Sequence, residues 1–270
     1  MPYILTLRHT WLEENRFQRG QAEHGADLAN DLQRMVDTYG GQTIAAVFVE
    51  PVAGSTGCLV PPKGYLERLR EICDANGILL VFDEVITGFG RIGGPFAAQV
   101  FGVTPDIITM AKALTNGCQP MGAVGVSDAV YETVVDGAPD GAIEFFHGYT
   151  YSGHPASCAA GNATLDIFEN ESLFERAAGL SEYFLDAVYG LRDIDLISDI
   201  RGIGFLAAID VKPGKKPGQR GGAIQKQLFV NGMHVKFTGD SGILAPQFIV
   251  EKDHIDEMIA ILRETLGAQS

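Results

Sequence analysis

Positively charged residues are scarce in this chain. Lysine and arginine together number 20 among 270 residues, against 34 aspartates and glutamates, so the formal net charge at neutral pH is −14. Nucleic acids and anionic membranes bind proteins mainly through lysine and arginine, so we expect neither to be the main partner. The charge balance favours small-molecule ligands, including a charged one held in a local basic pocket.

Cysteine is also rare, and it occurs in no metal-binding or redox pattern. The four cysteines, Cys58, Cys73, Cys118 and Cys158, include no CxxC pair, and none lies beside a histidine at metal-ligand spacing. The sequence therefore predicts no metal site and no redox disulfide. Four isolated thiols are typical of a reducing compartment, so we expect a cytoplasmic protein.

Sustained apolar stretches are missing as well. The first residues, MPYILTLRHTWLEE, lack the basic segment and long apolar run of a signal peptide. The longest uncharged run, residues 145–165, contains two histidines, three glycines and a proline, which a membrane helix would not carry. We therefore expect neither a signal peptide nor a membrane span.

Glycine, by contrast, is abundant. The 33 glycines exceed the average usage of about 7% and show no collagen repeat. Hydrophobic residues make up 46% of the chain and charged residues 20%, which is ordinary for a globular protein. At about 150 residues per domain, the length allows about two domains. So many glycines predict tight turns and close backbone contacts, as in an α/β enzyme.

Strands and helices alternate in the first half of the chain. Apolar periodicity predicts helices over 25–39, 64–76 and 95–101, and strands over 43–49, 78–82, 106–110 and 122–126. This order is typical of a parallel sheet with helical crossovers. Glu50, Asp83 and Lys112 lie where the first three strands end. Ligands of such sheets bind outside the carboxyl ends of the strands, so we expect these three residues on one rim.

The second half has a different character. We expect a helix over 171–191, short strands over 203–210, 233–237 and 243–245, and a final helix through 255–266. A basic loop rich in proline and glycine, KPGKKPGQRGG, spans 212–222. The prediction is a large domain over 1–168 with a mostly parallel sheet, followed by a small α+β domain over 169–270.

Two rim residues permit either a structural or a catalytic interpretation. Lys112 is either a surface lysine with its stem on apolar neighbours or a lysine that forms a Schiff base in a partly desolvated place. Asp83 is either a helix N-cap or the acid that keeps a pyridine ring nitrogen protonated. The glycines Gly88, Gly90 and Gly93 match GxGxxG, but five residues separate Phe82 from the first of them. This spacing disfavours a dinucleotide site.

Five segments together resemble the class III aminotransferases. They are VFVEPVAGSTGCLVPPKGYLERLREIC, ILLVFDEVITGFGRIG, FGVTPDIITMAKALTNG, PMGAV and FHGYTYSGHP. The similarity runs from about Leu7 to the C-terminus and is strongest to the ω-amino acid:pyruvate (β-alanine:pyruvate) branch. These are pyridoxal 5'-phosphate (PLP) enzymes of fold type I. The resemblance therefore implies transamination from an ω-amino acid or primary amine to pyruvate or a similar 2-oxo acid.

The resemblance also implies a role for each matching residue around the cofactor. Lys112 would bind PLP covalently and move the proton between substrate and cofactor. Asp83 would pair with the pyridinium, Val85 would press on one ring face, and Glu50 would make a structural contact on the cofactor side.

A second group of implied roles involves a partner subunit. Thr150 and the Tyr149 backbone would reach the cofactor phosphate of the neighbouring subunit, so the resemblance implies a homodimer. No metal is implied.

Three departures from the family set this chain apart. The branch usually has an arginine where this chain has Lys236, and that arginine grips the substrate carboxylate; lysine keeps the charge but loses the bidentate fork. Ser55 replaces a glutamate of the γ-aminobutyrate and ornithine branches, which favours ω-amino acid or amine donors. More than a third of a usual family chain is missing on the N-terminal side. We therefore expect the C-terminal portion of a transaminase, with little activity alone.

Two other functions stay open at this point. The chain could be a catalytically inactive fragment, or a subunit that pairs with another chain. The same scaffold could also support a PLP-dependent decarboxylase or aminomutase, which these residues do not exclude.

Overall fold

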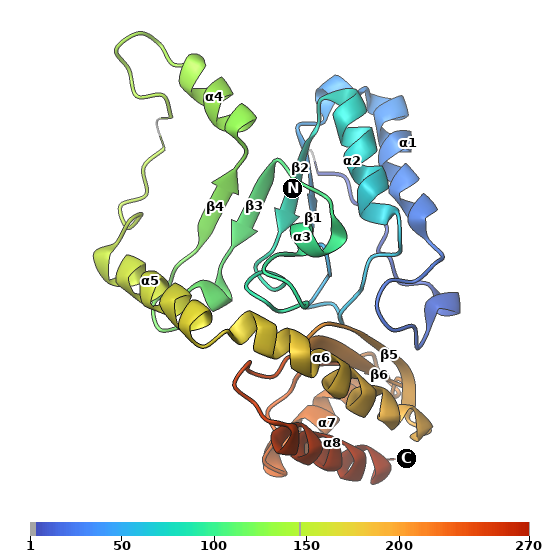
Figure 1. The fold of residues 1–270 in the computed structure, drawn as a ribbon. Helices are drawn as coiled ribbons and strands as arrows, with labels where there is room; N and C mark the ends of the chain where they lie inside the picture. Colours follow the sequence, from blue (N-terminus) through green and yellow to red (C-terminus); the bar gives the residue numbers. More distant parts are fainter. Residues whose placement is uncertain (1–3, 146, 270) are drawn as a thin grey trace.

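The chain builds two four-stranded sheets in the computed structural model, which describes residues 4–145 and 147–269 (Figure 1). The first sheet has the order β1 (Ala46–Val49), β2 (Leu79–Asp83), β3 (Ile107–Met110) and β4 (Ala123–Val126). The second has the order β5 (Ile197–Ile203), β6 (Leu206–Val211), β8 (Ser241–Leu244) and β7 (Lys236–Thr238). An α/β unit and an α+β unit therefore follow each other along the chain.

The first sheet is parallel except at one edge, as predicted. β1 pairs in parallel with β2, and β2 with β3, whereas β4 runs antiparallel to β3. The connection from β3 to β4 holds only the 3-10 turn Lys112–Leu114, which is no helical crossover of the kind that a parallel pair needs. The chain therefore reverses after Lys112.

Helices α1 (Asn30–Tyr39) and α2 (Tyr65–Asn76) pack on one face of this sheet. Their apolar residues form a core with alternate strand residues, including Val47, Leu80 and Phe82. α2 matches its predicted span closely because its apolar spacing is regular and Gly77 ends it at φ 64°. The predicted helix over 25–39 begins instead as the 3-10 turn Ala26–Ala29, and Gly41–Thr43 forms a second such turn that delays β1.

The remaining helices either follow strands of the first sheet or cover the second sheet. α3 (Ala97–Phe101) and α4 (Asp128–Asp136) are short, and Ser127 caps α4. α5 (Pro155–Asn170) and α6 (Leu173–Tyr189) run in sequence, and α6 packs with α7 (Gln219–Val230) and α8 (Lys252–Gly267) around a core that includes Phe184 and Phe205. Two further 3-10 turns are Glu13–Asn15 and Gly190–Asp193. The predicted division after residue 168 falls within α5 and stays a prediction.

No helix in the described part of the chain is long and apolar enough to cross a membrane.

Three predictions for the second half differ from the structure. The single strand expected over 203–210 is a hairpin of β5 and β6, which turns at Gly204. A Cβ at Gly204 would lie 2.3 Å from the carbonyl carbon of Ile92, so the tight turn depends on a partner distant in sequence. The basic loop over 212–222 contains the start of α7, since Asp240 accepts from the backbone of Gly218 and Gly221 at 3.0 and 2.8 Å. The strand expected over 233–237 begins only at Lys236.

A buried ionic network joins distant parts of the chain. Arg201 donates to both carboxylate oxygens of Asp210 at 2.7 and 2.8 Å and also to Asp199, which is 2% exposed. Trp11 Nε1 and the Phe17 amide also donate to Asp199, at 3.0 and 2.6 Å. Burial alone would lower the pKa of Arg201, but the hydrogen bonds and negative charges of these two aspartates raise it.

The same arginine reaches the loop that follows β1. Arg201 Nε donates to the Gly57 carbonyl oxygen at 3.0 Å. The network therefore ties the N-terminal segment, the loop after β1 and the second sheet into one unit.

We expect Arg201→Ala to lower the free energy of unfolding by about 3–5 kcal/mol, because Asp199 would stay buried without its cation. Urea unfolding followed by circular dichroism would measure the change. The matched control is Arg263→Ala, which removes a solvent-exposed pair with Asp193 and should cost less than about 1 kcal/mol. Equal losses in the two variants would contradict a special role for the buried network.

Candidate active site

The strand register places three ionisable residues at one edge of the first sheet. Val49 pairs with Phe82, so Glu50 follows level with Asp83. Asp83 pairs with Thr109, and Lys112 follows three residues later. Neighbouring parallel strands lie about 4.8 Å apart, so their carboxyl ends share one rim. The prediction that Glu50, Asp83 and Lys112 share this rim is confirmed.

The two carboxylates at the end of β2 have different tasks. Glu84 is fully buried and accepts hydrogen bonds from Ala97 N at 2.6 Å, Ala98 N at 2.9 Å and Thr87 Oγ1 at 2.9 Å. It therefore satisfies the first backbone donors of α3, which is the capping role considered for Asp83. Asp83 accepts only from the amide of Val85, at 3.1 Å, in the described part of the chain. The Asp83 carboxylate has no cationic partner there and is available to a ligand.

Lys112 has an unusual backbone for a lysine. It opens the 3-10 turn after β3 with φ 47°, in the left-handed region that side chains rarely adopt. Residues held in this region cluster at functional sites, where the surrounding structure enforces them. The side chain is exposed, and no acidic group in residues 4–145 or 147–269 pairs with its ammonium. The amine is therefore not committed to a structural ion pair.

Glu50 and Val85 follow the neighbouring strands β1 and β2 at this rim. Glu50 Oε2 accepts from the Gly54 amide at 3.1 Å and so holds the turn that follows β1. A Cβ at Gly54 would lie 2.7 Å from Ile86, so this turn also packs against the loop after β2. Val85 is half-buried beside Asp83. The hydrogen bond between Glu50 and Gly54 and the packing of Gly54 on Ile86 fix the backbone around the Asp83 carboxylate.

Tyr149 and Thr150 lie in an exposed segment between α4 and α5. The Tyr149 ring meets His147 edge-on, with 4.5 Å between the ring centroids. No hydrogen bond or ion pair joins either residue to Glu50, Asp83 or Lys112 within the described ranges. The chain therefore does not bring these two predicted residues to its own rim.

Lys236 lies at the start of β7, exposed and opposite Ile243. Side chains two apart on a strand share a face, so Lys236 and Thr238 point the same way. Thr238 lines an open cavity of about 410 Å³ together with Thr56, Arg201 and Ser241. Thr56 follows Ser55 in the loop after β1, so this cavity lies between that loop and the face of β7 that carries Lys236. The Ser241 hydroxyl there is buried and lacks a hydrogen-bond partner among the described residues.

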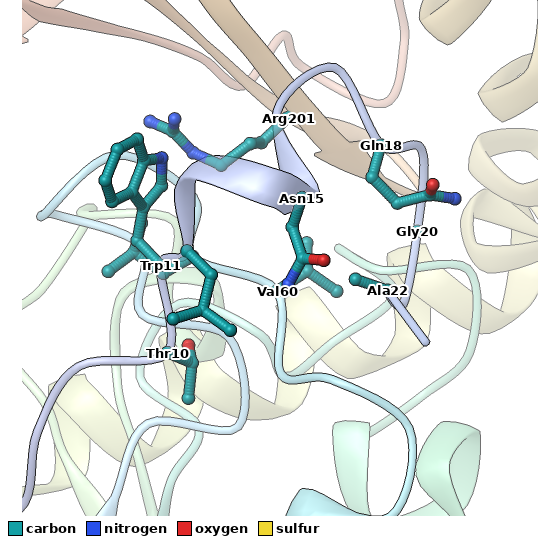
Figure 2. Close-up of a pocket in the computed structure, with 10 residues that line it drawn as sticks. Thr10, Trp11, Asn15, Gln18, Gly20, Ala22, Val60 and Arg201 are labelled. Atoms are coloured by element: carbon teal, nitrogen blue, oxygen red, sulfur yellow. The ribbon is translucent and has the colours of Figure 1, made fainter. Parts of the chain in front are cut away.

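A smaller hollow lies beneath the N-terminal segment. Figure 2 shows its lining residues, among them Thr10, Trp11, Gln18 and Arg201, and its volume is about 30 Å³. None of the predicted site residues borders it. This hollow has room for a water molecule or two, and Trp11 and Arg201 in its walls also belong to the buried ionic network.

One candidate site residue was missed by the sequence analysis. Arg91, in the loop after β2, donates to the carbonyl oxygens of Phe205 at 3.0 Å and Pro246 at 2.8 Å, and it lies 4.5 Å from the centroid of the Phe248 ring. Burial lowers its pKa to about 10. Arg91 therefore fixes the rim loop to the second sheet. Its contacts are with residues more than 100 positions away, so no local sequence pattern indicates them.

The comparisons with known proteins agree with this geometry. A family model described as "Aminotransferase class-III" matches residues 7–266. The chain belongs to the class III aminotransferases. An omega-aminotransferase of Caulobacter vibrioides is 53% identical over 263 residues, which is 97% of this chain and 60% of that protein. A beta-alanine–pyruvate aminotransferase of Pseudomonas aeruginosa is 44% identical over 264 residues, which is 97% of this chain and 59% of that protein.

Solved structures share the fold of this class III chain. The omega transaminase from Pseudomonas jessenii in complex with PMP matches with a TM-score of 0.86 at 33% identity, over 92% of this chain and 57% of that one. The fold is that of the fold type I PLP-dependent transferases, as predicted. The chain spans about three fifths of the length of the relatives that it matches.

The rim residues fit the cofactor on which class III aminotransferases depend. PLP needs an amine for covalent attachment and a carboxylate at its ring nitrogen. This rim carries one lysine amine and one aspartate, neither committed to a structural ion pair in the described chain. In that part of the chain no group of three or more histidine, cysteine or acidic residues could hold a metal ion.

We expect Glu84→Ala to lower the free energy of unfolding by about 2–3 kcal/mol, since two buried donors and one half-buried donor would lose their acceptor. Asp83→Ala loses one hydrogen bond and should cost less than about 1 kcal/mol. Thermal or urea unfolding of the two variants, side by side, would measure the difference. A larger loss for Asp83→Ala would mean that Asp83 is the structural carboxylate of the pair.

Proposed function

We propose that this chain carries the catalytic lysine and the cofactor-ring carboxylate of an ω-amino acid:pyruvate type transaminase. The amino group would pass from an ω-amino acid or primary amine to pyruvate or a similar 2-oxo acid. One observation carries the proposal: in a class III aminotransferase chain, Asp83 ends β2, Lys112 follows the parallel neighbour β3, and neither forms a salt bridge with a described residue.

When bound, PLP accepts the amino group and takes up the electrons released at the substrate carbon. Lys112 would supply the amine that attaches the cofactor and would then hold and move the proton at the substrate carbon. Its left-handed backbone fixes where the side chain leaves the rim. A lysine works in this way as a free amine, so its surroundings must exclude water during the reaction.

Asp83 would keep the ring nitrogen protonated. Its hydrogen bond from the Val85 amide orients the carboxylate and leaves oxygen lone pairs for the ring. Val85, two residues after Asp83, would press on one face of the ring. Glu50 would act through the backbone, because its bond to Gly54 shapes the turn beside the ring.

Lys236 would hold the carboxylate of the 2-oxo acid. An ammonium is a point charge without the planar fork of an arginine, so it would bind that carboxylate less tightly. Ser55 places no negative charge in the loop after β1, which supports a role for amine or ω-amino acid donors.

The same proposal includes a homodimeric assembly and a cytoplasmic location. Tyr149 and Thr150 would reach the cofactor phosphate of a second subunit in a homodimer. Tyr149 is 67% exposed, which supports this role because tyrosine side chains are enriched at interfaces. Four free cysteines support a reducing, cytoplasmic location.

We expect the purified chain to bind PLP through Lys112. Borohydride reduction should trap the cofactor on the peptide that contains Lys112, as read by mass spectrometry, and Lys112→Ala should remove the visible absorbance of bound PLP. Lys226→Ala, on the exposed side of α7, is the matched control and should keep both signals. No lysine-dependent signal in the wild-type chain would favour the non-catalytic fragment or partner subunit instead.

Lys236→Arg should lower the KM for pyruvate about five- to tenfold, because a bidentate guanidinium grips a carboxylate more strongly. The 270-residue chain alone is expected to turn over β-alanine and pyruvate poorly. The measurement therefore uses a chimaera that joins this chain to the unmatched part of the Caulobacter relative, in the order of that protein. An unchanged KM would mean that Lys236 does not face the acceptor carboxylate.

A further inference from the structure

The loop that joins β2 to α3, residues 84–96, is a closed unit at the rim, and we call it the rim loop. Glu84 at its start is fully buried and accepts hydrogen bonds from the first two amides of α3, at 2.6 and 2.9 Å, so one carboxylate holds the two ends together. Val85, which donates its amide to Asp83 at 3.1 Å, belongs to the same loop. A shift of the rim loop would therefore move the backbone that orients the Asp83 carboxylate.

The tip of the rim loop is fixed to the second sheet at Arg91. The Arg91 carbonyl oxygen accepts from the Phe205 amide at 2.9 Å, and Nη1 donates to the carbonyl oxygens of Phe205 at 3.0 Å and Pro246 at 2.8 Å. The next residue, Ile92, is 3% exposed, and a Cβ at Gly204 would lie 2.3 Å from its carbonyl carbon. Backbone and side chain therefore both join the rim loop to the β5–β6 hairpin, and we call these contacts the loop–sheet joint.

Arg91 makes this joint without a counter-ion. No carboxylate in the described part of the chain forms an ion pair with its guanidinium, which lies instead 4.5 Å from the centroid of the Phe248 ring. Removing a cation from water without an anion costs free energy. Arg201, which also links the two sheets, has two aspartates that compensate its charge. The rigid, planar fork of Arg91, which aligns several carbonyl groups at once, gives a reason for a cation at this place.

The two sheets carry opposite ends of the proposed substrate site. Asp83 and Lys112, at the rim of the first sheet, would hold the cofactor, and Lys236, on β7 of the second sheet, would hold a carboxylate. The hairpin that Arg91 grips and β7 belong to one sheet, in the order β5, β6, β8 and β7. The loop–sheet joint therefore helps to set the separation between the cofactor rim and the Lys236 ammonium.

We propose that Arg91 is a positioning residue that sets this separation and thereby selects the length of the ω-amino acid. A donor with its amino group at the cofactor and its carboxylate at Lys236 must span the gap, so the number of methylenes between the two groups has to match. This inference rests on the proposed function, which places the cofactor at Lys112 and the carboxylate at Lys236. A side chain that cannot hold the joint would let donors of other lengths compete.

Donor-length profiles test the proposal in the chimaera of this chain with the unmatched part of the Caulobacter relative. kcat/KM is measured with pyruvate and each of four donors: β-alanine, 4-aminobutanoate, 5-aminopentanoate and propylamine, which has no carboxylate for Lys236. Arg91→Met should lower the ratio between the best and the second-best amino acid at least about fivefold, because small misplacements far from the chemistry change rates strongly. The value for propylamine should change less than about twofold. Arg91→Lys, which keeps a donor for the carbonyl groups, should restore part of the ratio.

Arg176 offers a matched control for Arg91. From α6 it donates to the carbonyl oxygens of Phe248 and Val250, both at 2.9 Å, in the segment that also carries Pro246. None of its hydrogen bonds in the described structure reaches the rim loop. Arg176→Met should therefore keep the length ratio. Equal changes of that ratio in the two methionine variants, an equal loss for all four donors in Arg91→Met, or a parent chimaera that does not distinguish the three lengths would overturn the proposal.

A distance measurement separates this inference from the proposed function, because it requires no activity. Glu67 on α2, which packs on the first sheet, and Lys226 on α7, which packs on the second, are both exposed. Spin labels at Glu67→Cys and Lys226→Cys in the 270-residue chain report the separation of the two sheets by double electron–electron resonance. Cys118→Ser and Cys158→Ser remove the two native thiols that are not buried.

We expect one narrow distance distribution in the labelled parent, a shifted or broadened one with Arg91→Met, and the parent distribution with Arg176→Met. An unchanged distribution in Arg91→Met would overturn the joint whatever the activity. An inactive chimaera in which Arg91→Met shifts the distribution would overturn the proposed function, and the length selection with it, but would leave the joint in place.

Discussion

The parallel pairing of β1, β2 and β3 is the constraint on which the candidate site depends. Parallel strands point their carboxyl ends the same way, so the residue that follows each strand arrives at the same edge. Glu50, Asp83 and Lys112 are separated by about 30 positions each, yet the register makes them neighbours. The reversal at β4 is part of the same arrangement, because the turn that carries Lys112 links two neighbouring strands of the sheet.

A second constraint holds the rim loops in place from outside the sheet. Arg201 binds the carbonyl of Gly57 in the loop after β1, and Arg91 reaches from the loop after β2 to Phe205 and Pro246. Both arginines are largely buried, so their hydrogen bonds work in surroundings where water competes little. The second sheet therefore does more than carry Lys236; it also fixes the backbone around the first sheet's rim.

How much of this could be predicted from sequence depends on whether the cause is local. The helix over 64–76 was predicted well because its apolar spacing and Gly77 lie within the segment itself. The hairpin at Gly204 was missed because its tight turn depends on Ile92, more than 100 residues away. Asp199 and Arg201 interrupt the apolar pattern of β5 and hide that strand, since only the folded chain shows that they neutralise each other.

In the candidate site too, features with a local cause were predicted and features that depend on distant residues were missed. The rim positions of Asp83 and Lys112 followed from strand order alone. No role was predicted for the neighbouring Glu84, because its three hydrogen-bond donors lie in α3 and in the turn before it. Arg91 left no local pattern. Sequence therefore predicted where the chemistry lies and missed the contacts that hold it there.

The exposure of the Lys112 side chain limits what its amine can do in this chain alone. A lysine serves as a nucleophile when its surroundings remove water, and this chain alone leaves the Lys112 side chain in solvent. The chemistry proposed for Lys112 therefore depends on a cover that excludes water from the rim.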